Sequence, residues 1–154
     1  MGATTGIVTH HFIDRAELVE AALAHARHAM LERALALPPD STALDLLTAT
    51  LPTDAHMVRS WRVWLSIRAA ALHDPEMERF HREMYDEWRR AIELTARRDL
   101  GDATHVSVDH LMAVVDGIAL RATLDPGAWP AARQHAHLVM AWDAVHPAAR
   151  ASTT

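Results

Sequence analysis

The most constraining feature of this sequence is a series of helix start and stop signals that divides it into segments of helical length. Pro38-Pro39 and Pro52 each end an apolar segment, because proline lacks the backbone N–H and disfavours helix in the residue before it. Asp74-Pro75 is a start signal, with aspartate as N-cap and proline at the first helical position. Between these signals the apolar residues recur at helical spacing, and strand-like alternation is nearly absent. The sequence therefore predicts an all-α protein.

The signals predict six helices. They run from Asp14 to about Leu37, from Asp40-Ser41 to near Pro52, from about Ala55 to His73, from Pro75 to about Asp99, from about Val106 to Leu124, and from about Pro130 to His146.

One side of the helix that begins at Pro75 is expected to be apolar. It carries Met77, Phe80, Met84, Trp88 and Ile92. Asp116-Gly117 would ordinarily signal a turn, but the apolar period continues through it, so we expect helix there. A glycine inside a helix costs about 1 kcal/mol relative to alanine. The close approach of a second helix would be a reason to accept that cost.

Composition limits the class of protein. A length of 154 residues suits one domain with a sizeable core. No apolar run reaches the length of a membrane span, and no signal peptide is visible. The chain has no cysteine, which leaves the cytoplasm as the default compartment and excludes disulfides. A net charge of −5 argues against a surface covered by nucleic acid, although a small DNA-reading element is compatible with it.

The first residues carry a capping pattern. Asp14 and Glu17 have capping-box spacing, so a long helix is expected to start near Arg15. The run before and through this cap reads Gly-Ala-Thr-Thr-Gly-Ile-Val-Thr-His-His-Phe-Ile-Asp-Arg-Ala-Glu-Leu over residues 2–18. It resembles the turn and recognition helix of the TetR/AcrR family of transcriptional regulators, followed by the start of their connecting helix. It departs at Thr9, where the family usually carries an aromatic residue.

A second block of resemblance covers residues 108–126. Its Val-Asp-Gly triplet, apolar run and Asp-Pro are similar to the penultimate helix of the family's regulatory domain, especially the BetI-like type. The resemblance implies a TetR-type regulatory-domain helical bundle with a partial helix-turn-helix, of which only the recognition helix is present. The expected division is a helix-turn-helix remnant over 1–13, a ligand-binding and dimerisation domain over 14–147, and a disordered tail over 148–154.

The resemblance implies a repressor that is a homodimer, binds operator DNA and responds to a small-molecule effector. In such a protein the effector shifts the helix that begins at Asp14 and so changes the separation of two recognition helices. The residues expected to contact DNA are Thr4, Thr5, Thr9, His10, His11 and Arg15.

Family members carry further helices before this point, so we expect this chain to fold and dimerise but to bind DNA weakly and without sequence choice. Three explanations stay open. The first is that the start codon is assigned too late, and the second is that the chain is a genuine remnant. The third is that it is a non-DNA-binding dimerisation partner of full-length relatives.

The middle helices are expected to form the effector pocket. Their expected ligand-binding residues are Trp61, Trp64, Arg68, His81, Met84, Tyr85 and Trp88, with filling of the core as the alternative for most of them. The last two helices are expected to pair with their copies in a second subunit. The interface residues are expected to be Leu111, Val114, Val115, Ile118, Ala122, Leu138, Val139 and Trp142, with monomer core as the alternative.

An enzyme or a metal protein is the weaker reading. Glu78 and His81 form one Glu-x-x-His motif, but a di-iron bundle needs two such motifs and two further glutamates. His25 and His28 share a helix face without an obvious third ligand. No phosphate loop or nucleophile elbow is present. We therefore expect no catalytic residues, no metal and no cofactor.

Overall fold

The computed structural model describes residues 21, 23–24, 27–28, 31–100 and 104–146. Every regular element in these ranges is an α-helix, which confirms the predicted all-α class. The elements are α3 (Ala43–Ala49), α4 (Ala55–Ala71), α5 (Pro75–Leu100), α6 (Thr104–Leu124) and α7 (Ala131–Val145). The described residues of segment 21–35, which precedes α3, are also helical. The expected domain boundaries at 13/14 and 147/148 lie outside the described residues.

Two of the predicted helix starts are built as the sequence indicates. The Asp54 side chain accepts a hydrogen bond from the backbone N–H of Met57 at 2.9 Å and caps α4. The Asp74 side chain accepts from the N–H of Glu76 at 2.9 Å at the start of α5. Each carboxylate satisfies backbone donors that have no partner inside the helix.

The start of α3 differs from the prediction. Its N-cap is Thr42 rather than Asp40-Ser41. The Thr42 hydroxyl accepts from the N–H of Asp45, and the Asp45 carboxylate accepts from the N–H of Thr42. This reciprocal pair satisfies two backbone donors at once, and a cap at Asp40 or Ser41 would forgo it. The hydrogen bonds from the Thr42 side chain and backbone also lower the pKa of Asp45.

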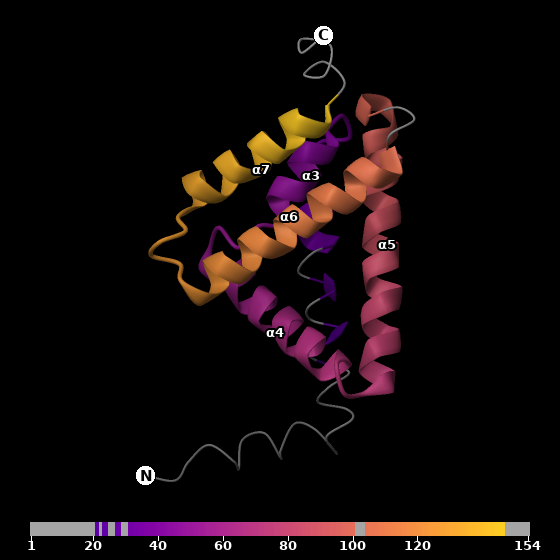
Figure 1. Ribbon diagram of the computed structural model, residues 1–154, viewed down its shortest axis with the longest axis vertical. Coiled ribbons are helices and arrows are strands. Elements are labelled where there is room, and N and C mark those ends of the chain that lie inside the picture. Colours follow the sequence, from indigo (N-terminus) through magenta and orange to yellow (C-terminus); the bar gives the residue numbers. More distant parts are fainter. Residues whose placement is uncertain (1–20, 22, 25–26, 29–30, 101–103, 147–154) are drawn as a thin grey trace.

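In Figure 1 the described residues of segment 21–35 lie between α4, α5 and α6. α4 and α5 meet at the turn around Asp74 and diverge from it, and α6 then crosses back toward α4 (Figure 1). α7 packs against α6, and the short α3 packs against both α5 and α7. The predicted helices over 106–124 and 130–146 therefore lie side by side, as α6 and α7. None of the described helices combines the length and the apolar character needed to cross a membrane.

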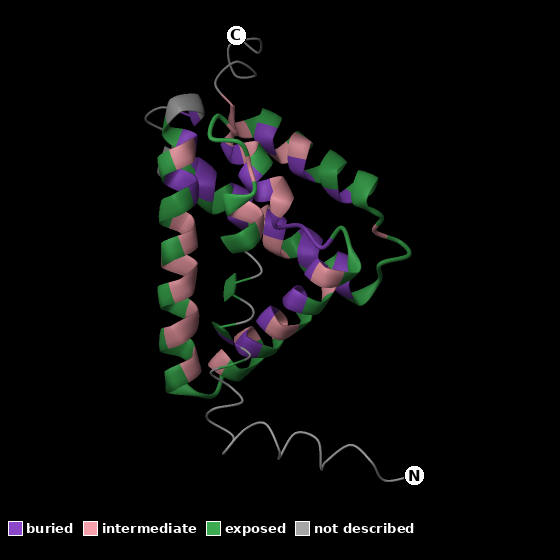
Figure 2. Ribbon diagram, turned by 180° about the vertical axis from the view of Figure 1, so that it is seen from behind, coloured by how far each residue is buried: buried purple, intermediate pink, exposed green. Residues whose placement is uncertain are grey.

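The core lies on the inward faces of these helices, as the burial colouring shows (Figure 2). The predicted apolar side of α5 is confirmed. Ile92 is fully buried, and the other four residues of that side pack against the core. Gly117 lies within α6, so the predicted continuation of the helix through Asp116-Gly117 is also confirmed.

Two polar side chains fix the segment between α3 and α4 inside this core. The indole N–H of Trp61 donates to the backbone oxygen of Thr50 at 2.6 Å, and both residues are almost completely buried. The Gln134 side-chain amide, also buried, donates to the backbone oxygens of Pro52 at 3.2 Å and Trp129 at 2.9 Å. Because a buried carbonyl without a partner costs free energy, these bonds orient α4 and α7 around one connection.

Replacing Trp61 with phenylalanine should therefore destabilise the chain more than its change in volume suggests. The variant leaves the Thr50 carbonyl without its indole donor, which costs about 1–3 kcal/mol before any cavity is counted. Urea unfolding followed by circular dichroism measures the loss. Trp129→Phe, at a half-buried tryptophan in the loop before α7, is the matched control and should lose less than Trp61→Phe. Equal losses would contradict the assigned role of the Trp61 hydrogen bond.

Candidate ligand-binding site

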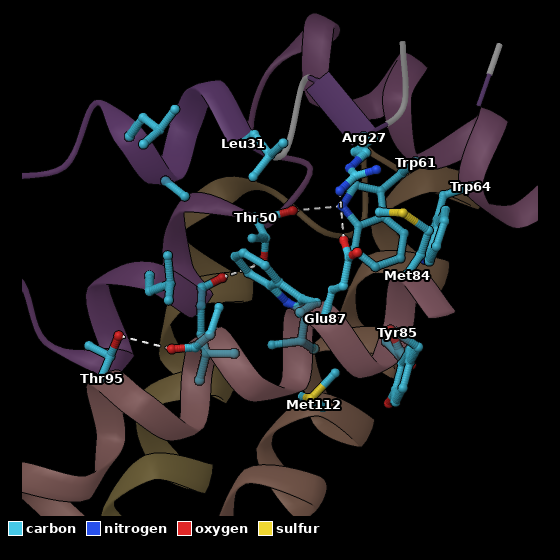
Figure 3. A pocket seen from close by; sticks show the side chains of 18 of the residues that line it. Arg27, Leu31, Thr50, Trp61, Trp64, Met84, Tyr85, Glu87, Thr95 and Met112 are labelled. Atoms are coloured by element: carbon cyan, nitrogen blue, oxygen red, sulfur yellow. Dashed lines mark hydrogen bonds and ion pairs between the residues drawn. The ribbon is translucent and has the colours of Figure 1, made fainter. Parts of the chain in front are cut away.

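A pocket of about 250 Å³ lies between segment 21–35 and helices α3, α4, α5 and α6. Figure 3 shows that side chains from several helices, including Leu31, Thr50, Met84 and Met112, surround the same space. Its lining is mainly apolar, with a few charged and hydroxyl groups. The lining residues are Arg27, Leu31, Ala34, Leu35, Leu46, Leu47, Thr50, Trp61, Trp64, Arg68, Met84, Tyr85, Glu87, Trp88, Ala91, Thr95, Met112, Val115 and Asp116. This combination is typical of sites for small organic molecules.

The structure brings the expected ligand-binding residues together. Six of the seven line the pocket: Trp61, Trp64, Arg68, Met84, Tyr85 and Trp88. The seventh, His81, does not line it. Its ring lies next to two of the lining side chains, with centroids 5.5 Å from Trp64 and 5.7 Å from Tyr85. Trp61 and Trp64 are also members of the core, so the predicted alternative of core filling applies to them as well.

Arg68 lies at the centre of the polar part of the pocket. Its guanidinium carbon is 5.8 Å from the Trp61 ring centroid, 5.5 Å from that of Trp64 and 5.8 Å from that of Tyr85. Its Nη2 donates to Oδ1 of Asp116 on α6 at 2.8 Å. The ring faces attract the cation and the carboxylate neutralises it, so Arg68 is held by residues of three helices.

Burial beside this charge pair shifts two neighbouring pKa values. Burial, and next the positive charge of Arg68, lower the pKa of His81, while Asp116 opposes the shift. His81 is therefore neutral at neutral pH. Burial, and next the negative charge of Asp116, raise the pKa of Tyr85. Its hydroxyl thus stays protonated and donates to Oδ2 of Asp116 over 3.5 Å.

Sequence reasoning missed the pocket walls that come from outside α4 and α5. Segment 21–35 contributes four residues, α3 and its end contribute Leu46, Leu47 and Thr50, and α6 contributes Met112, Val115 and Asp116. A signal for Asp116 was present, because an isolated carboxylate in an apolar helix requires a partner. No comparable signal marks the others, which are ordinary apolar residues.

Two ion pairs attach segment 21–35 to the helices beside it. Arg27 pairs with Glu87 of α5 at 2.9 Å, and both side chains are about half exposed. Arg33 pairs with Asp54 at the start of α4. Exposed pairs of this kind contribute at most about 1 kcal/mol each. These two polar contacts therefore attach the segment to α4 and α5 only weakly.

Most of the residues expected at a dimer interface are covered by their own chain. Leu111, Val115, Ile118, Ala122, Leu138 and Trp142 are buried, and Val114 and Val139 are half-buried. Val115 also lines the pocket. The alternative of monomer core therefore describes the six buried residues within one chain, and the contact between copies stays a prediction.

The residues expected to contact DNA, Thr4, Thr5, Thr9, His10, His11 and Arg15, lie outside the described residues. Within the described ranges, no group of three or more histidine and acidic side chains is arranged to hold a metal ion. His28, one half of the weak histidine pair noted in the sequence, forms an ion pair with Glu32 at 2.9 Å when it is protonated.

Comparison with known proteins identifies the family to which this architecture belongs. The family model described as "BetI-type transcriptional repressor, C-terminal" matches residues 39–146. The HTH-type transcriptional regulator PksA of Bacillus subtilis is 28% identical over 134 residues, covering 81% of this chain and 65% of PksA. The HTH-type transcriptional regulator BetI of Escherichia coli O45:K1 is 30% identical over 138 residues, covering 80% of this chain and 67% of BetI. The chain thus spans about two thirds of the length of these relatives.

Solved structures share the fold. A transcriptional regulator from Rhodococcus sp. Rha1 superposes with a TM-score of 0.73 at 20% identity, over 94% of this chain and 79% of that one. A regulator from Saccharomonospora viridis, solved in complex with choline, gives a TM-score of 0.72 at 20% identity. That match covers 90% of this chain and 78% of the other.

The lowered pKa of His81 predicts how the stability of the folded chain depends on pH. The unfolded chain binds a proton at this residue below about pH 6.5, whereas the folded chain resists it. The stabilisation is therefore fully present above that pH and is lost as the pH falls through the lower folded pKa. His81→Phe and His81→Gln remove this titration, so both should lose less stability than the wild type between about pH 7 and pH 5.5. Thermal unfolding across this range measures the difference, and identical slopes in all three proteins would contradict it.

Proposed function

Because the chain belongs to the TetR family of transcriptional regulators and carries a BetI-type C-terminal domain, we propose that its described part is an effector-sensing and dimerisation body. The effector is a small organic molecule that binds in the pocket between segment 21–35 and α3 to α6. Operator DNA is the partner of the complete repressor, through the residues resembling a recognition helix.

The observation that carries this proposal is the position of segment 21–35. It supplies Arg27, Leu31, Ala34 and Leu35 to the pocket wall, and the residues that resemble the recognition helix come shortly before it in the sequence. A ligand in the pocket would therefore touch the same stretch of chain that leads to the DNA-reading residues. The choline complex of the Saccharomonospora viridis protein supports the proposal, because that protein shares this fold and was solved together with a small organic molecule.

The response to the effector follows from the weak attachment of that segment. Its ion pairs with Glu87 and Asp54 are partly exposed, so a ligand that packs against Leu31 and Leu35 can shift its position at little cost. In a dimer, such a shift changes the separation of two DNA-reading elements and so their fit to operator half-sites.

We place the dimer contact on the outward faces of α6 and α7. One stripe of α6 is exposed and is apolar except for His110; it consists of Val106, His110, Ala113, Gly117, Leu120 and Leu124, all at helical spacing. On α7, Met140 is 69% exposed next to the half-buried Val139. Apart from its chain neighbours and the backbone of its own helix, a Cβ added to Gly117 would meet no described atom within 4 Å, so the described residues give no packing reason for glycine there. Close approach of the partner's helix would supply one.

Blocking the pocket should abolish binding of small apolar molecules. Ala91 lines the pocket, so Ala91→Trp places an indole in the space that a ligand would occupy. We expect this variant to bind the dye anilinonaphthalene sulfonate at least roughly tenfold more weakly than the wild type, a loss of about 1.4 kcal/mol. Fluorescence titration of the folded proteins measures it. Ala70→Trp, at an exposed alanine of α4 outside the pocket, is the control and should bind as the wild type does. Unchanged binding by Ala91→Trp would contradict the pocket as the site.

A charge at Gly117 should separate the proposed dimer. We expect the wild-type chain to elute with twice its monomer mass in size-exclusion chromatography with light scattering. Gly117→Glu should elute as a monomer, because the two-fold contact would bury a carboxylate and its copy together. Ala69→Glu, at an exposed position of α4, should remain dimeric. A monomeric wild type, or a dimeric Gly117→Glu variant, would defeat the proposed contact face.

A further inference from the structure

The polar end of the pocket is an aromatic box that already contains a cation. The rings of Trp61, Trp64 and Tyr85 lie around the Arg68 guanidinium, each with its centroid between 5.5 and 5.8 Å from the guanidinium carbon. Such a box is the arrangement by which proteins hold quaternary ammonium groups from a ligand. In this chain the protein's own side chain fills it.

The carboxylates that line the pocket are committed to partners within the chain. Asp116 accepts from Arg68 at 2.8 Å and from the Tyr85 hydroxyl at 3.5 Å. Glu87 accepts from Arg27 at 2.9 Å. A cationic ligand would therefore find carboxylates that are already neutralised, and it would have to compete with an arginine for each of them.

Donor capacity, by contrast, is left over at Arg68. A guanidinium has five N–H groups and no acceptor. Its Nε is buried and has no hydrogen-bond partner among the described residues. Because a buried donor without a partner costs about 1–3 kcal/mol, a ligand oxygen that reached this guanidinium would recover a cost that the empty pocket carries.

We propose that the pocket selects an effector with an apolar body and an anionic oxygen headgroup, such as a carboxylate, and that Arg68 is the residue that determines this selectivity against quaternary ammonium compounds. The proposal rests on the proposed function of the pocket as the effector site and names the ligand class for it. The hydrocarbon body would lie against the apolar walls formed by Leu31, Leu46, Leu47, Met84, Met112 and Val115.

Electrostatics and hydrogen bonding both favour this choice. A carboxylate near Arg68 gains a charge-assisted hydrogen bond in a largely apolar surrounding, where such bonds are strong. A quaternary ammonium group can enter the box only if Arg68 leaves three rings and Asp116 together. If Arg68 stays, the two positive charges lie side by side away from bulk water, which is unfavourable.

Three probes of equal chain length test the selectivity. Octanoate, octanol and octyltrimethylammonium have main chains with the same number of carbons and differ in the charge of the head. Isothermal titration calorimetry of the wild-type chain at neutral pH should give the tightest binding for octanoate and the weakest for octyltrimethylammonium. The dissociation constants of these two probes should differ by at least roughly tenfold, since a hydrogen bond to a charged group contributes enough free energy for that difference.

The variant Arg68→Met combined with Asp116→Asn removes the cation from the box without leaving either charge unpaired. It should lose octanoate binding by roughly tenfold or more, gain binding of octyltrimethylammonium, and leave octanol nearly unchanged. Arg82→Gln, at an exposed arginine of α5 outside the pocket, is the matched control and should behave as the wild type does with all three probes. The wild-type series decides the proposal even where the double variant fails to fold.

Two failures are distinguishable. If octyltrimethylammonium binds the wild type as tightly as octanoate does, and Ala91→Trp abolishes that binding, the selectivity assigned to Arg68 is overturned and the effector pocket stands. If none of the three probes binds the wild type, both the selectivity and the proposed effector pocket are overturned.

Discussion

The Arg68–Asp116 pair is the polar contact that links the middle helices at the pocket. It joins α4 to α6, and the Tyr85 hydroxyl of α5 donates a hydrogen bond to the same carboxylate. Both side chains of the pair are about a quarter exposed, so water screens the charges only in part. Removal of either partner would leave the other charge without its counterion in a partly buried site, which costs free energy. The pair therefore sets the charge at the polar end of the pocket, while the apolar core holds α4, α5 and α6 together.

The walls of the pocket differ in how strongly the rest of the protein holds them. On one side lie α4, α5 and α6, whose side chains form the core around Trp61 and Ile92. On the other side lies segment 21–35, which places Leu23 in the core but whose ion pairs are partly exposed and whose Leu35 is 82% exposed. Exposed ion pairs and exposed apolar side chains hold a segment less strongly than a packed core does. A pocket built in this way favours a response to ligand in which the weakly held wall moves and the helical body stays.

α6 has two apolar faces, and this accounts for the way its residues are distributed. One face carries Leu111, Val115 and Ile118 into the core, and the other exposes Leu120 and Leu124. Exposed apolar side chains at helical spacing favour a contact with another molecule. Among the described residues, α4, α5 and α7 pack against α6 and leave its second face exposed, and the contact that we propose between copies lies there.

The sequence by itself determined the helical class and most helix limits, because caps such as Asp54 and Asp74-Pro75 act on their own first turn and need no distant partner. It also indicated that the aromatic residues of α4 and α5 belong together, since their spacing places them on shared faces. Only the tertiary structure decided which apolar face of α6 lies inside, because hydrophobic periodicity is the same for a core and for an interface. It also decided that Asp116 neutralises Arg68 and that segment 21–35 closes the pocket. These contacts join residues far apart in the chain, and no local pattern encodes a distance between helices.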